Sequence, residues 1–161
     1  MADGSVEFDL RRLLAETRVS ELTLTVVPLL SPDQTLEEAA AAMREVSHGS
    51  ALVCRRNRLV GIITERDLLG LLSDDTDFSS SVEESMTADP QTISSDDTLL
   101  DVVRLMDRGG YRRLPVLNGS REPAGIVDVK TVMNFVVDQV PNTVYNQASN
   151  ELLSAKRAEG A

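Results

Sequence analysis

The stretch that decides the fold is Leu59-Val60-Gly61-Ile62-Ile63-Thr64-Glu65-Arg66-Asp67-Leu68-Leu69. Its first half is a short apolar run that predicts a buried strand, with Gly61 allowing another part of the chain to approach closely. Thr64 stands where a helix N-cap belongs and Asp67 follows three positions later, so a helix is predicted to begin at residue 65. A strand that runs directly into a helix brings a hydroxyl, a carboxylate and several unpaired backbone N–H groups to one place.

Thr64 and Asp67 allow two interpretations. Helix N-termini favour anions, and a carboxylate accepts hydrogen bonds from paired sugar hydroxyls, so this spot suits a ribose and a phosphate. The same Thr-x-x-Asp spacing is close to a capping box, and capping alone would explain both residues. The functional interpretation gains weight because the surrounding pattern occurs twice.

The two copies can be aligned residue by residue. Ser31-x-Asp33-x-Thr35-Leu36 matches Ser94-x-Asp96-x-Thr98-Leu99 at an offset of 63, and Gly61-Ile62-Ile63 matches Gly125-Ile126-Val127 at an offset of 64. The duplication predicts two strand–helix–strand–strand–helix units related by a pseudo-twofold axis. Each unit is too small to bury its sheet face alone, so we expect an α/β fold in which the units pack sheet to sheet.

The repeat also sets the expected domain boundaries. These are an N-terminal helical extension at 1–18, a first repeat at 19–73, an acidic polar linker at 74–81, a second repeat at 82–140 and a C-terminal extension at 141–161. Hydrophobic periodicity predicts helices at 6–15, 36–46, 65–72, 98–108 and 129–140. Strands are expected at 22–27, 50–54, 59–63, 92–93, 114–117 and 124–127.

Composition limits the partners. The chain has 161 residues with 26 acidic and 16 basic side chains, and its net charge of −10 repels a nucleic-acid backbone. Its single cysteine, Cys54, lies in an apolar run. We predict that it is a small buried residue of a protein in a reducing compartment. Neither a signal peptide nor an apolar run of membrane-spanning length is visible. We therefore expect a cytoplasmic protein without a nucleic-acid or membrane partner.

The duplicated pattern resembles the cystathionine-β-synthase (CBS) domain, and the two copies together resemble a CBS tandem, or Bateman module. The resemblance covers residues 19–140. It is carried by Val82-Glu83-Glu84-Ser85-Met86-Thr87, Asp96-x-Thr98-Leu99, Gly110-Tyr111-Arg112-Arg113-Leu114-Pro115-Val116 and Gly61-Ile62-Ile63-Thr64-Glu65-Arg66-Asp67. It implies a regulatory module that has no resident cofactor and is not an enzyme. The implied ligand is AMP, ADP or ATP, with S-adenosylmethionine or NAD as alternatives.

The resemblance also implies a binding site between the repeats. Asp67 would hold the ribose hydroxyls, and Thr64 would lie near the phosphates. The opposite repeat would supply Tyr111, Arg112 and Arg113 before one strand and Met86 and Thr87 at the entry to another. Adjacent strand residues face opposite ways, so only one of the two arginines is expected to point directly into the cleft. The alternative is that both arginines form a solvated edge.

The second repeat departs from the pattern. Asp128 stands at the Thr position and Thr131 at the Asp position, and the opposing segment His48-Gly49-Ser50 brings no arginine. A carboxylate is unfavourable where a phosphate should lie. We expect this second cleft to be weak, empty or differently selective, with Asp128 serving at least as an N-cap. His48 has no matching carboxylate or cysteine at ligand spacing, so no metal or catalytic role is expected for it.

Two other functions remain open. The chain could be a ligand-free scaffold for dimerisation, with Thr64 and Asp67 only capping a helix. A small hydrolase is the third hypothesis, but the sequence shows no set of catalytic residues that supports it. The resemblance implies a homodimer that meets through its helices, and possible partners include an unidentified regulated protein. The expected apolar helix surface consists of Ala39, Ala40, Leu68, Leu71, Val132 and Val136.

Overall fold

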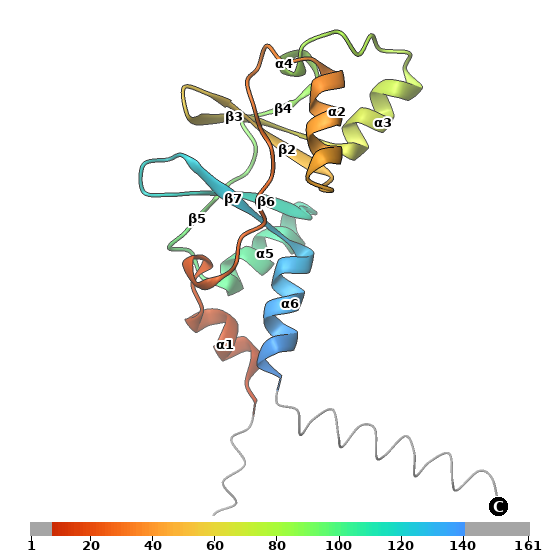
Figure 1. The fold of residues 1–161 in the computed structure, drawn as a ribbon. Helices are drawn as coiled ribbons and strands as arrows, with labels where there is room; N and C mark the ends of the chain where they lie inside the picture. The colour runs from red at the N-terminus through yellow and green to blue at the C-terminus, as the bar shows by residue number, and fades with distance from the viewer. Residues whose placement is uncertain (1–7, 141–161) are drawn as a thin grey trace, which may run out of the picture.

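A computed structural model describes residues 8–140, in which two β-sheets face each other and helices lie on their outer sides (Figure 1). The first sheet has the order β1-β2-β3-β4, and the second has the order β5-β6-β7. The strands of the two sheets are β1 Leu29–Leu30, β2 Ser50–Arg55, β3 Arg58–Thr64, β4 Thr87–Ala88, β5 Ile93–Ser94, β6 Arg113–Leu117 and β7 Pro123–Asp128. The predicted fold of two repeats packed sheet to sheet is confirmed.

The helices follow the predicted pattern closely. They are α1 Leu10–Glu16, α2 Leu36–Glu45, α3 Glu65–Ser73, α4 Val82–Ser85, α5 Leu99–Gly109 and α6 Val129–Gln139, with a 3-10 turn η1 at Val19–Glu21. Thr35, Thr64 and Thr98 cap α2, α3 and α5 with their hydroxyls, and Asp128 caps α6 with its carboxylate. Each cap accepts from a backbone N–H that the helix itself leaves unpaired.

Alternation along the strands separates three cores. In β2, Ala51 and Val53 face the helices of the first repeat, while Leu52 faces the other sheet. In the second repeat, Val127 joins the helix-side core and Ile126 joins the core between the sheets. Successive strand residues point to opposite faces, so each sheet is buried on both sides.

Each repeat completes the edge of the other repeat's sheet. Strand β4 follows the linker, yet its Thr87 pairs with Ile62 of β3 in the first repeat. Thr25, which precedes the first repeat's strands, forms a bridge with Ile126 of β7 in the second repeat. Ile62 and Ile126 are equivalent positions of the duplication, so the exchange is symmetric. Each sheet edge therefore contains backbone from both repeats.

The strand predicted at 22–27 is wrong. Leu22 is buried in the second repeat's core and Val27 in the core between the sheets, while Val26 is 80% exposed. This segment crosses from one core to another. Its alternating apolar residues pack into these two cores and do not mark a strand of a sheet. The strand forms only beyond Pro28, at Leu29–Leu30, where it pairs with β2.

The expected apolar helix surface also needs correction. Ala39, Leu68 and Val132 are buried within the cores. Ala40, Leu71 and Val136 are partly buried against the same cores. The exposed apolar residues of α3 and α6 are instead Leu69, Leu72, Val129, Met133 and Val137.

Two further expectations concern the ends of the chain and membranes. Helix α1 begins at Leu10, with Asp9 as its cap, and the earlier part of the predicted N-terminal helix lies outside the described residues. The C-terminal extension at 141–161 also lies outside them. Within residues 8–140, no helix has the length and apolar character needed to cross a bilayer.

Candidate functional site

A cavity of about 360 Å³, the first cleft, lies where α3 begins and the second repeat reaches across. It is lined by Ile62, Thr64, Arg66, Asp67, Thr87, Pro90, Gln91, Gly110, Tyr111, Arg112, Arg113 and Pro115. Six of the seven residues that the sequence predicted for the site line this cavity: Thr64, Asp67, Thr87, Tyr111, Arg112 and Arg113. Residues from both repeats therefore meet around one cavity.

Thr64 and Asp67 form a reciprocal pair at the start of α3. Oδ2 of Asp67 accepts hydrogen bonds from the backbone N–H and the hydroxyl of Thr64, at 2.8 and 2.7 Å. Thr64 and Asp67 therefore form a capping box for α3. Within residues 8–140, Oδ1 of Asp67 accepts no hydrogen bond, so one carboxylate oxygen keeps its acceptor capacity beside the cavity.

Both arginines line the first cleft. That only one of them points directly into it stays a prediction. Strand β6 begins at Arg113, so Arg112 precedes the strand and does not follow its alternation. Arg112 is exposed, whereas Arg113 is half-buried. The side chain of Arg113 reaches back to the first repeat, where its Nη2 would lie 3.3 Å from a Cβ built on Gly49.

Met86 is the one predicted site residue that does not line the cleft. Its side chain lies against Gly61 so closely that a Cβ on that glycine would collide with the thioether. It packs with the core of the first repeat and holds β4 beside β3, which leaves Thr87 as the residue that reaches the cavity. The close approach expected at Gly61 is therefore made by Met86.

Six lining residues were not among the predicted site residues: Ile62, Arg66, Pro90, Gln91, Gly110 and Pro115. Arg66 lies inside the Thr-x-x-Asp motif and could have been found there. Pro90 and Gln91 follow β4, and only the pairing of β4 with the other repeat brings them to the cavity. No local sequence signal reports that pairing.

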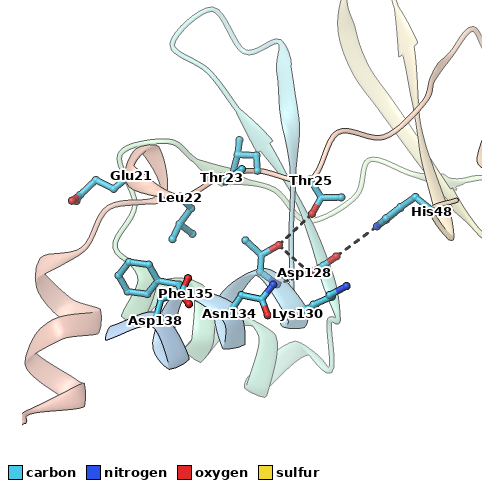
Figure 2. Close-up of a pocket in the computed structure, with 12 residues that line it drawn as sticks. Glu21, Leu22, Thr23, Thr25, His48, Asp128, Lys130, Asn134, Phe135 and Asp138 are labelled. Carbon is cyan, nitrogen blue, oxygen red and sulfur yellow. Dashed lines mark hydrogen bonds and ion pairs between the residues drawn. The ribbon is translucent and has the colours of Figure 1, made fainter. Parts of the chain in front are cut away.

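A second cavity of about 510 Å³, the second cleft, lies at the start of α6 and extends along it (Figure 2). It is lined by Glu21, Leu22, Thr23, Leu24, Thr25, His48, Asp128, Lys130, Thr131, Asn134, Phe135 and Asp138. Oδ1 of Asp128 accepts from the backbone N–H and hydroxyl of Thr131, at 2.7 and 3.0 Å. The hydroxyls of Thr131 and Thr25 are 3.3 Å apart.

His48 faces a carboxylate after all. Its Nε2 lies 3.5 Å from Oδ2 of Asp128, and its Nδ1 lies 3.1 Å from the hydroxyl of Ser50 (Figure 2). Spacing in the sequence could not show this carboxylate, because it comes from the other repeat, 80 residues away. No group of three or more His, Cys, Asp or Glu suited to a metal ion occurs among residues 8–140.

Strand register shows what replaces the arginines in the second cleft. Ser50 pairs with Thr64, and Arg113 pairs with Asp128. Since Thr64 and Asp128 are equivalent, Ser50 stands at the position of Arg113. One and two residues earlier, Gly49 and His48 stand at the positions of Arg112 and Tyr111.

The two clefts consequently differ in charge. The first cleft is lined by three arginines and one carboxylate, Arg66, Arg112, Arg113 and Asp67. The second is lined by three carboxylates and one lysine, Glu21, Asp128, Asp138 and Lys130. Burial by itself raises the pKa of the Asp128 carboxyl, but hydrogen bonds from Thr131 and the contact with His48 outweigh it and lower that pKa.

The model of the family described as CBS domain matches residues 19–74 and 80–138. An uncharacterized 17.7 kDa protein of Acidianus ambivalens is 36% identical over 123 residues, which are 76% of this chain and 74% of that protein. Protein MJ0188 of Methanocaldococcus jannaschii is 28% identical over 141 residues, 86% of this chain but only 50% of that protein. The chain thus spans about half the length of this second relative.

Solved structures share the fold. A CBS domain protein of Pyrobaculum aerophilum, PAE2072, complexed with AMP, gives a TM-score of 0.66 at 24% identity and covers 71% of this chain and 88% of its own. The CBS domain pair of protein MJ0100, in complex with 5-methylthioadenosine and S-adenosyl-L-methionine, also gives 0.66, at 23% identity. It covers 74% of this chain and 98% of its own.

Proposed function

This chain belongs to the CBS domain family, and we propose that it is a regulatory module that binds an adenine nucleotide of the AMP, ADP or ATP type in the first cleft. The observation that carries the proposal is the composition of that cleft. Thr64 and Asp67 come from one repeat, while Thr87, Arg112 and Arg113 come from the other. A ligand that touches both groups would link the two repeats.

The chemistry of the lining suggests an orientation for the ligand. Oδ1 of Asp67 accepts from the ribose hydroxyls, because it is the carboxylate oxygen that the cap does not use. Arg112 and Arg113 bind the phosphate groups, which guanidinium groups recognise through paired N–H donors. The N-terminus of α3 adds a favourable field for the same anion. Adenine then lies toward Ile62, Pro90 and Pro115, the apolar part of the lining.

A module of this kind acts by changing the relative stability of two arrangements of its repeats. A ligand that binds one arrangement better shifts the population toward it by its difference in affinity. The proposed output is therefore a change in how the repeats present their outer helices to a regulated protein. No chemical step and no resident cofactor are needed, and we place the module in the cytoplasm.

The relatives support the ligand class. PAE2072 is described in complex with AMP, and the MJ0100 domain pair with two other adenosyl compounds. These complexes agree on an adenosyl group and differ in what is attached to it. The arginines of the first cleft favour a phosphate at that position, which is why we propose a nucleotide ahead of S-adenosylmethionine or NAD.

A ligand-free scaffold is the second candidate, because Thr64 and Asp67 already satisfy each other as a cap. Calorimetric titration of AMP, ADP, ATP, NAD and S-adenosylmethionine into the chain separates the candidates. We expect binding of at least one phosphorylated adenine nucleotide, with a stoichiometry of one per chain. Absence of heat with all five would favour the scaffold, and turnover of any of them would support an enzyme.

We also propose that the chain forms a homodimer through α3 and α6. Leu69 and Leu72 on α3 and Met133 and Val137 on α6 are 48–66% exposed, an unusual amount of apolar surface for two short helices. A closed twofold dimer is the commonest arrangement that covers such a surface.

A further inference from the structure

The second cleft follows one face of α6 over the length of that helix. Asp128 lies at one end, Thr131 and Asn134 follow, and Asp138 lies at the other end. Ten residues separate the two carboxylates, which corresponds to about 15 Å along the helix axis. In the first repeat, α3 contributes only residues of its first turn to the cleft. The second cleft therefore has an extension without a counterpart in the first.

Carboxylates stand at both ends of this extended cleft. At the inner end, the side chain of Asp128 is 16% exposed. Among residues 8–140, the one polar contact of its Oδ2 is with Nε2 of His48 at 3.5 Å, which is long for a hydrogen bond. At the outer end, Glu21 and Asp138 are exposed (Figure 2). Lys130, an exposed residue of the first turn of α6, is the one permanently cationic side chain among the lining residues.

The wall between the two ends combines three apolar side chains with threonines and Asn134. Leu22 is buried, and Leu24 and Phe135 are half-buried along the cavity. Apolar side chains and hydroxyl or amide acceptors between two anionic ends complement a chain of methylenes that carries ammonium groups. A phosphorylated ligand would instead meet carboxylates at both ends, which is electrostatically unfavourable.

We propose that the second cleft binds a linear aliphatic polyamine. One terminal ammonium donates to Oδ2 of Asp128, and the other end of the chain lies between Glu21 and Asp138. The methylenes pack against Leu22, Leu24 and Phe135. The tetraamine spermine, when extended, has a length comparable to the spacing of the two carboxylate ends.

The test is calorimetric titration of spermine into the full chain at low ionic strength, with Asp138→Asn as the variant and Asp74→Asn as its control. Asp74 is equivalent to Asp138 in the duplication, is also exposed, and lines neither cleft. Each substitution removes one negative charge, so a non-specific attraction to the acidic chain would weaken equally in both. We expect Asp138→Asn to weaken spermine binding about threefold to tenfold and Asp74→Asn to leave it unchanged.

A length series provides the second readout. The short diamine putrescine reaches only one end of the cleft, so it should bind at least about tenfold more weakly than spermine. Equal weakening by the two substitutions would overturn the proposal, as would equal affinity for the two amines or absence of spermine binding. AMP binding should be the same in Asp138→Asn and the unaltered chain, so the result does not depend on the function proposed for the first cleft.

Discussion

Oδ1 of Asp128 accepts a hydrogen bond from the hydroxyl of Thr131, at an oxygen–oxygen distance of 3.0 Å, at the start of α6. The same bond joins Thr64 and Asp67 at the start of α3, where Oδ2 of Asp67 accepts from the Thr64 hydroxyl at 2.7 Å. The two pairs are equivalent in the duplication, with the residue types exchanged. The carboxylate lies three residues inside the helix in the first cleft and at the cap in the second, and this exchange underlies the differences we expect between the clefts.

The first prediction concerns ribose recognition by Asp67. Asp67→Ala removes a charged acceptor and should cost about 1.5–3 kcal/mol of AMP binding, roughly tenfold or more in affinity. The substitution also removes part of a helix cap, so unfolding by urea must be measured beside calorimetry. Asp101→Ala is the matched control, because Asp101 forms the same pair with Thr98 on α5 and lines neither cleft. If Asp67→Ala folds and binds AMP normally while Asp128→Ala abolishes binding, nucleotide binding belongs to the second cleft.

Phosphate recognition is the subject of the second prediction. Arg112→Gln should weaken AMP about tenfold and adenosine much less, since only AMP carries the anion that the guanidinium binds. The difference should be larger at low salt than at high salt, because Arg112 is exposed and its field is screened. Arg58→Gln, at the first residue of β3, removes an exposed arginine that lines neither cleft. Equal losses of AMP and adenosine affinity in Arg112→Gln would contradict a phosphate contact.

The third prediction tests the contact between Gly61 and Met86. Gly61→Ala places a methyl group against the Met86 thioether and should destabilise the fold by about 1–3 kcal/mol in urea unfolding. The strand β4 carries Thr87 to the first cleft, so AMP affinity should fall as well. Gly70→Ala is the control, because a Cβ there meets no atom within 4 Å and alanine is the better helix former. Gly70→Ala should be neutral or stabilising by up to about 1 kcal/mol.

The fourth prediction concerns acid stability. The pKa of Asp128 is lowered in the folded chain, so the folded state favours its ionised form. That contribution is present above the carboxyl's unfolded pKa of about 3.9 and is lost as the pH falls through the lower folded value. Asp128→Asn should therefore reduce the free energy of unfolding at pH 7 and lose less of it between pH 5 and pH 3. Parallel unfolding curves for the variant and the unaltered chain over that range would contradict the coupling.

The fifth prediction concerns self-association. The mass of the chain by light scattering at micromolar concentration should be that of a dimer, and Leu72→Glu should shift it toward the monomer. Leu72 is 57% exposed on α3, so the change places a charge in the proposed interface without disturbing the core. The control is Val26→Glu, at a residue that is 80% exposed and lies outside both helices. A monomeric mass for the unaltered chain would contradict the homodimer.

What the sequence by itself determined is the local architecture and its duplication. The caps at Thr35, Thr64 and Thr98 involve residues three positions apart, and the strand–helix junction at Thr64 is written in one short stretch. Patterns of this range depend on backbone geometry alone, so periodicity and spacing predict them. The sheet-to-sheet fold followed because each duplicated unit was too small to bury its own sheet.

What only the tertiary structure decided is where the two repeats touch. The pairing of Thr87 with Ile62, the contact of His48 with Asp128 and the seating of Met86 on Gly61 join residues far apart or in different repeats. The segment 22–27 shows the same limit, since its alternation came from two cores on either side of a crossing chain. These contacts form only when the two folded sheets pack against each other. The spacing of residues along the chain therefore does not predict which of them meet across that interface.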